Sequence, residues 1–234
     1  MKKLKRGKIK ALIRTLKSKD YIVYDKPYQM NIVGERKDST KPNSFDDRII
    51  MFWKNDKKDW EGYEAPATTD AGTYWLKKAS KSKGTALLKE GQYKDTYKLD
   101  KHNGKYLALT QRLKDVTVIR DYNRDDVLDF NNGNEDTGMF GINIHRADKD
   151  GTTTYIGEYS AGCQVFANAE DFDKMIEWAQ RHEKLYGNVF TYTLIDERAY
   201  NRRIRRRIIF GVGIGIGVVG IGIATYFLIK KYRK

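Results

Sequence analysis

Residues that cross-link a fold or coordinate metal are scarce in this sequence. The 234 residues include one cysteine, Cys163, and three histidines, His102, His145 and His182. A single cysteine has no partner for an intramolecular disulfide. One cysteine and three histidines are too few to favour a structural zinc site. We therefore expect no metal and no other cofactor. Proline is also rare, with three residues, whereas aromatic residues make up 12% and hydrophobic residues 40%. This apolar content excludes a disordered chain and predicts one or two folded domains.

Acidic charge is nearly missing from both ends of the chain. Residues 1–20 contain nine Lys or Arg and one Asp (+8), and residues 202–234 contain nine Lys or Arg and no acid (+9). Of the net charge of +14, residues 21–201 therefore carry −3. A basic groove within the folded part is not supported, so we expect no nucleic-acid partner.

One long uncharged run, residues 208–229, lies near the C-terminal end of the sequence. As a helix it would span ~33 Å, which matches the hydrocarbon core of a bilayer. Basic residues flank it on both sides, and Tyr226 and Phe227 lie where interfacial rings are common. We predict that residues 202–234 form a single-pass transmembrane anchor in contact with membrane lipid, and the flanking charges do not orient it.

The predicted anchor is rich in glycine. Gly211 and Gly215, and likewise Gly213 and Gly217, have the GxxxG spacing that lets two helices approach closely in lipid. Self-association through these glycines and an anchor without a partner both remain open.

Residues 1–20 carry a basic start but no apolar stretch of the length found in a secretory signal. Apolar residues recur there at helical spacing, which predicts a short basic amphipathic helix. Such a helix could lie on anionic lipid, touch nucleic acid, or pack on its own domain with the basic face in solvent.

The middle of the chain, residues 21–201, has the pattern of one β-rich domain. A helix is expected from an N-cap at Asn168 to a C-cap at Gly187. β-Branched and aromatic residues separated by turn residues predict strands. These strands are expected at residues 28–33, 48–53, 72–76, 85–88, 106–110, 116–120, 140–145, 152–159 and 189–195.

The neighbours of Cys163 are those expected of a nucleophile. Gly162 precedes it, and a glycine there leaves room for substrate and for N–H groups that could hold an oxyanion. A thiol is mostly protonated at neutral pH and needs a base within reach. His145 lies upstream, which is the reverse of the order in papain-like enzymes.

His145, fourteen intervening residues and the run Ser160-Ala161-Gly162-Cys163 resemble the active-site signature of the L,D-transpeptidase family. Residues 68–74, TTDAGTY, are similar to that family's upstream T-P-x-G-x-F segment, which begins a strand, and residues 140–145, FGINIH, to the strand that leads into its histidine. The resemblance covers roughly residues 28–195. It implies a mainly β (α+β) fold, an L,D-transpeptidase-like β-sandwich with one main helix. It also implies cutting and rejoining of peptidoglycan stem peptides through a cysteine thioester.

The resemblance assigns roles to individual residues. Cys163 would be the nucleophile, His145 the general base and Ser160 a group that positions the histidine, while N–H groups around Gly162 and Cys163 would form the oxyanion hole. The family commonly has an arginine two positions after the cysteine, where this chain has Val165. Arg146 and Gln164 are therefore the expected substrate-binding residues.

An acidic segment offers a competing site. Asp121, Asn123, Asp125 and Asp129 fall at positions 1, 3, 5 and 9 of an EF-hand-like loop, but the glycine at position 6 and the glutamate at position 12 are missing. We interpret it as an acidic surface turn. His102 and His182 are expected at the surface.

The leading hypothesis is a membrane-anchored cysteine peptidoglycan hydrolase (an L,D-carboxypeptidase or endopeptidase) or L,D-transpeptidase, with its domain facing the cell wall or carried in a virion. Residues 67–76, 136–147 and 160–166 also resemble cell-wall-active proteins encoded by bacteriophages, which implies a role in phage lysis or entry. A non-catalytic peptidoglycan-binding or virion structural protein is the alternative. A third hypothesis is a membrane-permeabilising protein, but its single helix has no polar face to line a pore.

Overall fold

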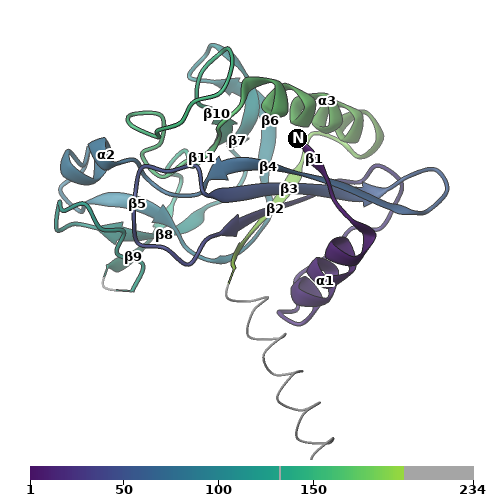
Figure 1. Ribbon diagram of the computed structural model, residues 1–234, viewed down its shortest axis with the longest axis horizontal. Helices are drawn as coiled ribbons and strands as arrows, with labels where there is room; N and C mark the ends of the chain where they lie inside the picture. The colour runs from purple at the N-terminus through teal and green to yellow at the C-terminus, as the bar shows by residue number, and fades with distance from the viewer. Residues whose placement is uncertain (132, 198–234) are drawn as a thin grey trace, which may run out of the picture. The chain divides into compact units, whose positions relative to one another are not determined.

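The computed structural model describes residues 1–131 and 133–197 (Figure 1). The predicted anchor, residues 202–234, with its span 208–229 and its glycine motifs, lies outside the described residues. Within the described part, no helix is long and apolar enough to cross a membrane.

Twelve strands and three helices make up the described chain, which is mainly β, as predicted. The helices are α1 (Arg6–Lys17), α2 (Thr73–Lys77) and α3 (Ala169–Tyr186). The strands are β1 (Lys2–Lys3), β2 (Asn31–Arg36), β3 (Asp47–Lys54), β4 (Trp60–Thr68), β5 (Thr85–Leu88), β6 (Gly91–His102), β7 (Tyr106–Gln111), β8 (Val116–Asp121), β9 (Asn134–Gly138), β10 (Ile144–Arg146), β11 (Gln164–Phe166) and β12 (Phe190–Asp196).

The larger sheet closes on itself. Its strands follow the order β4-β11-β10-β7-β6-β12-β2-β3, and β3 pairs back with β4, while β1 adds to β4. Two of these pairings are parallel, β10 with β11 and β12 with β2. A separate small sheet has the order β5-β8-β9. This closure differs from the two-sheet sandwich that the resemblance implied, because strand edges pair through tertiary contacts that periodicity does not specify.

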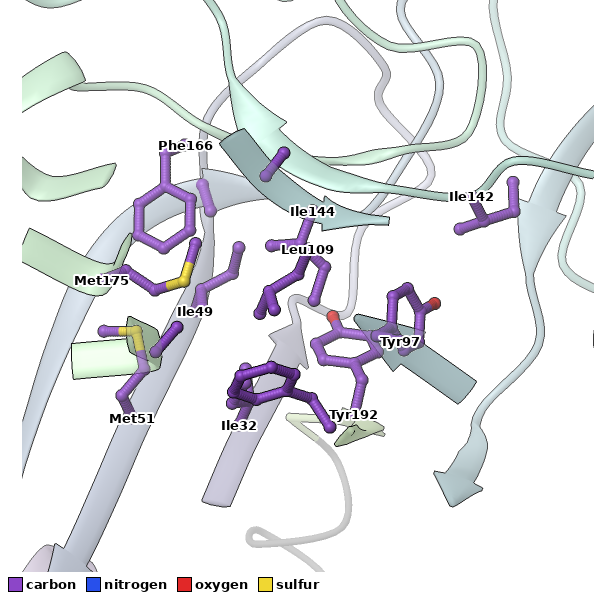
Figure 2. Close-up of a cluster of buried hydrophobic side chains, with 14 of the residues drawn as sticks. Ile32, Ile49, Met51, Tyr97, Leu109, Ile142, Ile144, Phe166, Met175 and Tyr192 are labelled. Carbon is purple, nitrogen blue, oxygen red and sulfur yellow. The ribbon is translucent and has the colours of Figure 1, made fainter. Parts of the chain in front are cut away.

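Apolar side chains fill the interior of the closed sheet. Figure 2 shows Ile32, Ile49, Leu109, Ile144 and Tyr192 directed toward one another from different strands, with Met175 of α3 among them. All six are at most 2% exposed, as expected of a close-packed core.

The two longer helices each bury one face. In α3, the Asn168 side chain accepts a hydrogen bond from Asp171 N at 2.9 Å, and Gly187 ends the helix with φ +89°, which confirms both predicted caps. In α1, Ile9 and Leu12 are at most 1% exposed, so the apolar stripe of the helix packs on its own domain.

Two predicted strands are wrong, and the strand expected at residues 140–145 is formed only from Ile144 onward. Residues 73–77 form helix α2, because Thr68 ends β4 and the chain then turns through Asp70 and Gly72. Residues 152–159 form turns with isolated bridges at Thr152 and Tyr155. The upstream motif therefore ends a strand and begins a helix, rather than beginning a strand.

Candidate active site

The parallel pairing of β10 with β11 brings the two signature segments together. Ile144 is in register with Gln164, and Gln164 N donates a hydrogen bond to Asn143 O at 2.9 Å. Cys163 therefore lies beside Asn143, at the start of β11, and His145 follows two residues further along the neighbouring strand.

Gly162 cannot be replaced without distortion. Its φ is +119°, and a Cβ atom built on it would lie 2.1 Å from the backbone oxygen of Ala86 in β5. Both the left-handed conformation and the close approach require glycine. The turn before Cys163 is thus held against the small sheet.

Cys163 is partly exposed and lines a pocket of about 150 Å³. The wall combines aromatic rings, two cationic side chains and backbone from the small sheet. It is formed by Trp75, Ser80, Lys81, Gly84, Thr85, Ala86, Arg120, Phe140, Gly141, Ile142, Ala161 and Cys163. Neither His145 nor Arg146 is among these residues.

The thiol of Cys163 is held in its protonated form. Its Sγ donates a hydrogen bond to Gly141 O at 3.5 Å. Burial of the sulfur raises the pKa of Cys163 to about 11, against a smaller opposing effect of the Asn143 backbone N–H. Gln111 supports the loop that carries Gly141, because its Oε1 accepts hydrogen bonds from Phe140 N and Ile142 N.

His145 is neutral and has a defined tautomer. Burial, and then the neighbouring His102 ring, lower the pKa of His145 to about 3. Its Nδ1 lies 2.8 Å from Arg146 O, and a carbonyl can only accept, so Nδ1 carries the proton. The unprotonated nitrogen is therefore Nε2, the atom that a general base would use.

His102 belongs to the site, contrary to the prediction of a surface residue. Its ring stacks on that of His145, with centroids 4.2 Å apart and planes 20° apart. Asn143 Oδ1 accepts from Gln111 N, so its Nδ2 donates to His102 Nδ1 at 3.1 Å. Asn143 thus contacts His102 through its side chain and lies beside Cys163 through its backbone.

The imidazole and the thiol belong to neighbouring segments of the sheet. No hydrogen bond joins His145 to Cys163 within residues 1–131 and 133–197. With a pKa of about 3 on the imidazole and about 11 on the thiol, the resting site holds both groups uncharged rather than as a thiolate–imidazolium pair. Proton transfer between them requires the His145 ring and the Cys163 sulfur to move closer together. Substrate binding can bring about this movement.

Three other predicted site residues are placed differently from expectation. Ser160 Oγ donates to Cys163 O at 2.8 Å and accepts from Gly162 N at 3.1 Å, so it braces the turn and does not contact His145. Gln164 is fully buried, and its Oε1 accepts from Tyr192 OH at 2.7 Å, so it is not accessible to substrate.

Arg146 is also directed away from the Cys163 pocket. Its guanidinium lies over the Tyr106 ring, 4.5 Å from the centroid, and pairs with Asp173 at 3.3 Å. These contacts hold the side chain against α3. The positive charge expected from Arg146 is therefore not supplied to the pocket.

Two other cationic residues, which the sequence did not indicate, supply positive charge to the pocket. Arg120 of β8 and Lys81 line the pocket, with their charged groups 4.6 and 5.6 Å from the Phe140 ring centroid. Arg120 also pairs with Asp136 at 3.0 Å. Both lie far from Cys163 in the chain, and the fold brings them into the lining of the same pocket.

The upstream motif, residues 68–74, supports the site from behind. Arg36 pairs with Asp70 at 2.8 Å and donates to Thr69 O at 2.8 Å, and Asp47 Oδ2 accepts from Thr69 N at 2.7 Å. Burial, and then the Asp70 charge, raise the pKa of Asp47 to about 8. This network fixes the loop in which Gly72 N donates to Ser160 O at 2.9 Å, and so fixes the turn before Cys163.

The remaining candidate ligands do not form a metal site. In the acidic turn, the Asn123 amide donates to Asp125 and Asp129 at 2.9 and 2.7 Å, and Asp121 Oδ2 accepts from Asp129 N. Across the described chain, no group of three or more His, Cys, Asp or Glu side chains is arranged to hold a metal ion.

His182, expected at the surface, is a buried structural residue. Its Nδ1 accepts a hydrogen bond from Met30 N at 3.0 Å, and its Nε2 donates to Val189 O at 3.3 Å. The side chain joins α3 to the segments that begin β2 and β12, and it takes no part in the site.

Comparison of the chain with family models, with curated proteins and with solved structures found no match.

Proposed function

We propose that this chain is a cysteine-dependent enzyme that cleaves amide bonds in peptidoglycan stem peptides. In this proposal it is held at a membrane by residues 202–234. One observation carries the proposal. A partly exposed cysteine lines a pocket, and a neutral histidine on the adjacent strand has its Nε2 unprotonated. The resemblance of both segments to the L,D-transpeptidase signature supplies the substrate class.

The chemistry begins with attack by the Cys163 sulfur on a peptide carbonyl carbon. As the C–S bond forms, the thiol proton passes to His145 Nε2, and the carbonyl oxygen becomes an oxyanion. The Gly162 N–H already donates to Ser160 Oγ, so the Cys163 N–H is the oxyanion donor that we assign. Collapse of this intermediate breaks the C–N bond, and His145 returns the proton to the leaving amine.

The resulting thioester has two fates. Water attacking the thioester carbon gives hydrolysis, and an amine of a second stem peptide gives a cross-link; either step regenerates the thiol. The neutral resting state supports a mechanism in which proton transfer accompanies attack, since free thiolate is scarce when the thiol pKa is about 11.

The cations of the pocket fit the substrate class. Stem peptides carry free carboxylates, and Arg120 and Lys81 place positive charge in the same pocket as Cys163. Arg120 is 5% exposed and its guanidinium already pairs with Asp136, so a substrate carboxylate would share it with Asp136 and meet the Lys81 ammonium directly. We assign to these two residues the substrate contact that the resemblance had placed on Arg146 and Gln164.

A non-catalytic peptidoglycan-binding or virion structural protein is the second candidate. It is favoured by the missing hydrogen bond between His145 and Cys163 and by the raised pKa of the thiol. In that case the pocket would bind stem peptides through Arg120 and Lys81 without chemistry.

Incubation with purified peptidoglycan separates the two candidates. The full chain in detergent should release or cross-link muropeptides, identified by mass spectrometry, and Cys163→Ala should abolish the products while leaving sedimentation with the wall intact. Wall binding without any product would favour the non-catalytic candidate. Arg124→Ala, on the exposed turn outside the pocket, is the matched control and should behave as wild type.

A further inference from the structure

The basic residues of α1 form a stripe on the face opposite its buried side. Arg6, Lys10, Arg14 and Lys17 recur at helical spacing, and all four are exposed. The buried face carries Ile9, Leu12 and Leu16. Because the apolar residues are already packed on the domain, α1 cannot insert them into lipid, and its only free face is the cationic one.

The stripe stands out against the rest of the described chain. Residues 21–201 carry a net charge of −3, whereas residues 1–20 carry +8. Arg6 is neutralised by Asp59 at 2.5 Å, but Lys10 and Lys17 form no ion pair within the described residues. Lys10 and Lys17, on one exposed helix face, mark a surface for an extended anionic partner.

The end of the folded domain lies close to the C-terminal end of α1. Lys19, just past the helix, pairs with Glu90 at 2.8 Å, and the same carboxylate accepts from Asp196 N, at the end of β12, at 3.4 Å. The chain then continues through ten residues, 198–207, which can reach at most about 35 Å. The last six of these ten residues include five arginines, and the 22-residue uncharged run begins directly after them.

We propose that the basic stripe of α1 docks on anionic lipid headgroups of the membrane that holds the C-terminal run. This inference rests on the membrane anchorage in the proposed function. It adds that the basic face of α1 is the surface that contacts the bilayer. Each Lys or Arg near an anionic surface contributes about 1 kcal/mol, and the attraction is screened by salt. The tether of residues 198–207 raises the local concentration of α1 at that surface.

Lysine footprinting of the full chain tests the docking. The chain is reconstituted in vesicles of phosphatidylcholine alone or of phosphatidylcholine with phosphatidylglycerol, and acetylation rates are read by mass spectrometry. Lys10 and Lys17 should react about fivefold more slowly with phosphatidylglycerol present, and high salt should restore the rate. Lys101 and Lys105, on the exposed β6–β7 turn, should be unchanged.

Charge reversal supplies the matched pair of variants. Lys10→Glu with Lys17→Glu should remove the protection of neighbouring Lys3 and Lys5, whereas Lys101→Glu with Lys105→Glu should retain it. Equal rates in the two vesicle types would overturn the proposal. So would equal protection of Lys10 and Lys17 by duplex DNA without vesicles, which would assign the stripe to nucleic acid.

Failure of the anchor gives a different result. Extraction of the chain from phosphatidylcholine vesicles by carbonate would show that the C-terminal run does not insert. Protection of Lys10 and Lys17 by phosphatidylglycerol vesicles would, even then, support docking of α1.

Discussion

The imidazole rings of His145 and His102 stack with their centroids 4.2 Å apart. Burial lowers the pKa of both rings; the His102 ring lowers that of His145 further, and the charges of Arg112 and Lys105 lower that of His102. Arg146 O fixes the proton of His145 on Nδ1. The pair therefore presents His145 Nε2 as an unprotonated acceptor throughout the neutral pH range.

The resting thiol should be unreactive. With a pKa of about 11, alkylation of Cys163 by iodoacetamide should rise about tenfold per pH unit from pH 7 to 10 and stay slower than that of glutathione. Because no hydrogen bond joins His145 to the sulfur within the described residues, His145→Ala should leave this rate nearly unchanged. A plateau near pH 6 that disappears in His145→Ala would instead indicate a resting ion pair.

The stability of the domain should fall in acid through His145. The pKa of His145 is about 3 when folded, below the ordinary value of 6.5, so the unfolded chain binds the proton first. Stability is therefore full above about pH 6.5 and declines as pH falls toward 3, by up to ~1.4 kcal/mol per pH unit. Urea unfolding should show this slope in the wild type and a shallower one in His145→Gln. Parallel slopes would contradict the burial of a neutral His145.

Gly162→Ala should destabilise the domain by ~2 kcal/mol or more. The new Cβ would lie 2.1 Å from Ala86 O, and φ +119° is strained for alanine. Gly151→Ala is the control, since Gly151 also has a positive φ (+65°) but no atom within 4 Å of a built Cβ. Chemical denaturation should give a clearly smaller loss for the control. Equal losses would mean that the contact with β5 is relaxed.

Arg120→Gln should weaken binding of stem peptides through loss of a carboxylate contact. We expect the Kd or KM for the stem peptide to rise about tenfold. For a peptide whose carboxylate is amidated, the same substitution should raise Kd or KM less. Arg120 also pairs with Asp136, so unfolding measurements on the same variant monitor stability. Arg146→Gln is the comparison, and it should change binding little. An equal loss for both variants would remove the special role of the pocket cations.

Local sequence patterns predicted several elements well. The strand expected at residues 85–88 matches β5, and the caps of α3 were found because their side chains and φ angles act over three or four residues. Strand β6 was missed because polar residues such as Lys94 and Asp95 interrupt its alternation. The closure of the sheet was missed because the pairings of β4 with β11 and of β12 with β2 join segments far apart in the sequence and leave no local signal.

The site was predictable only in part. Cys163 and His145 were identified from residue types within one segment, and their parallel strands bring them side by side. His102 and Arg120 reach the site from β6 and β8, and Lys81 from the loop after α2, so their proximity depends on the complete fold. Arg146 and Gln164 lie near in sequence, but the alternation of β10 and β11 directs them elsewhere.

Trapping of the acyl-enzyme tests the central claim most directly. The full chain is mixed with a synthetic stem tetrapeptide, quenched in acid and analysed by intact-mass and peptide mass spectrometry. The account predicts an adduct equal to the peptide minus its leaving amine, located on Cys163, absent from Cys163→Ala and reduced in His145→Ala. Release of products with no adduct on Cys163, or with activity retained in Cys163→Ala, would contradict the assignment of Cys163 as the nucleophile.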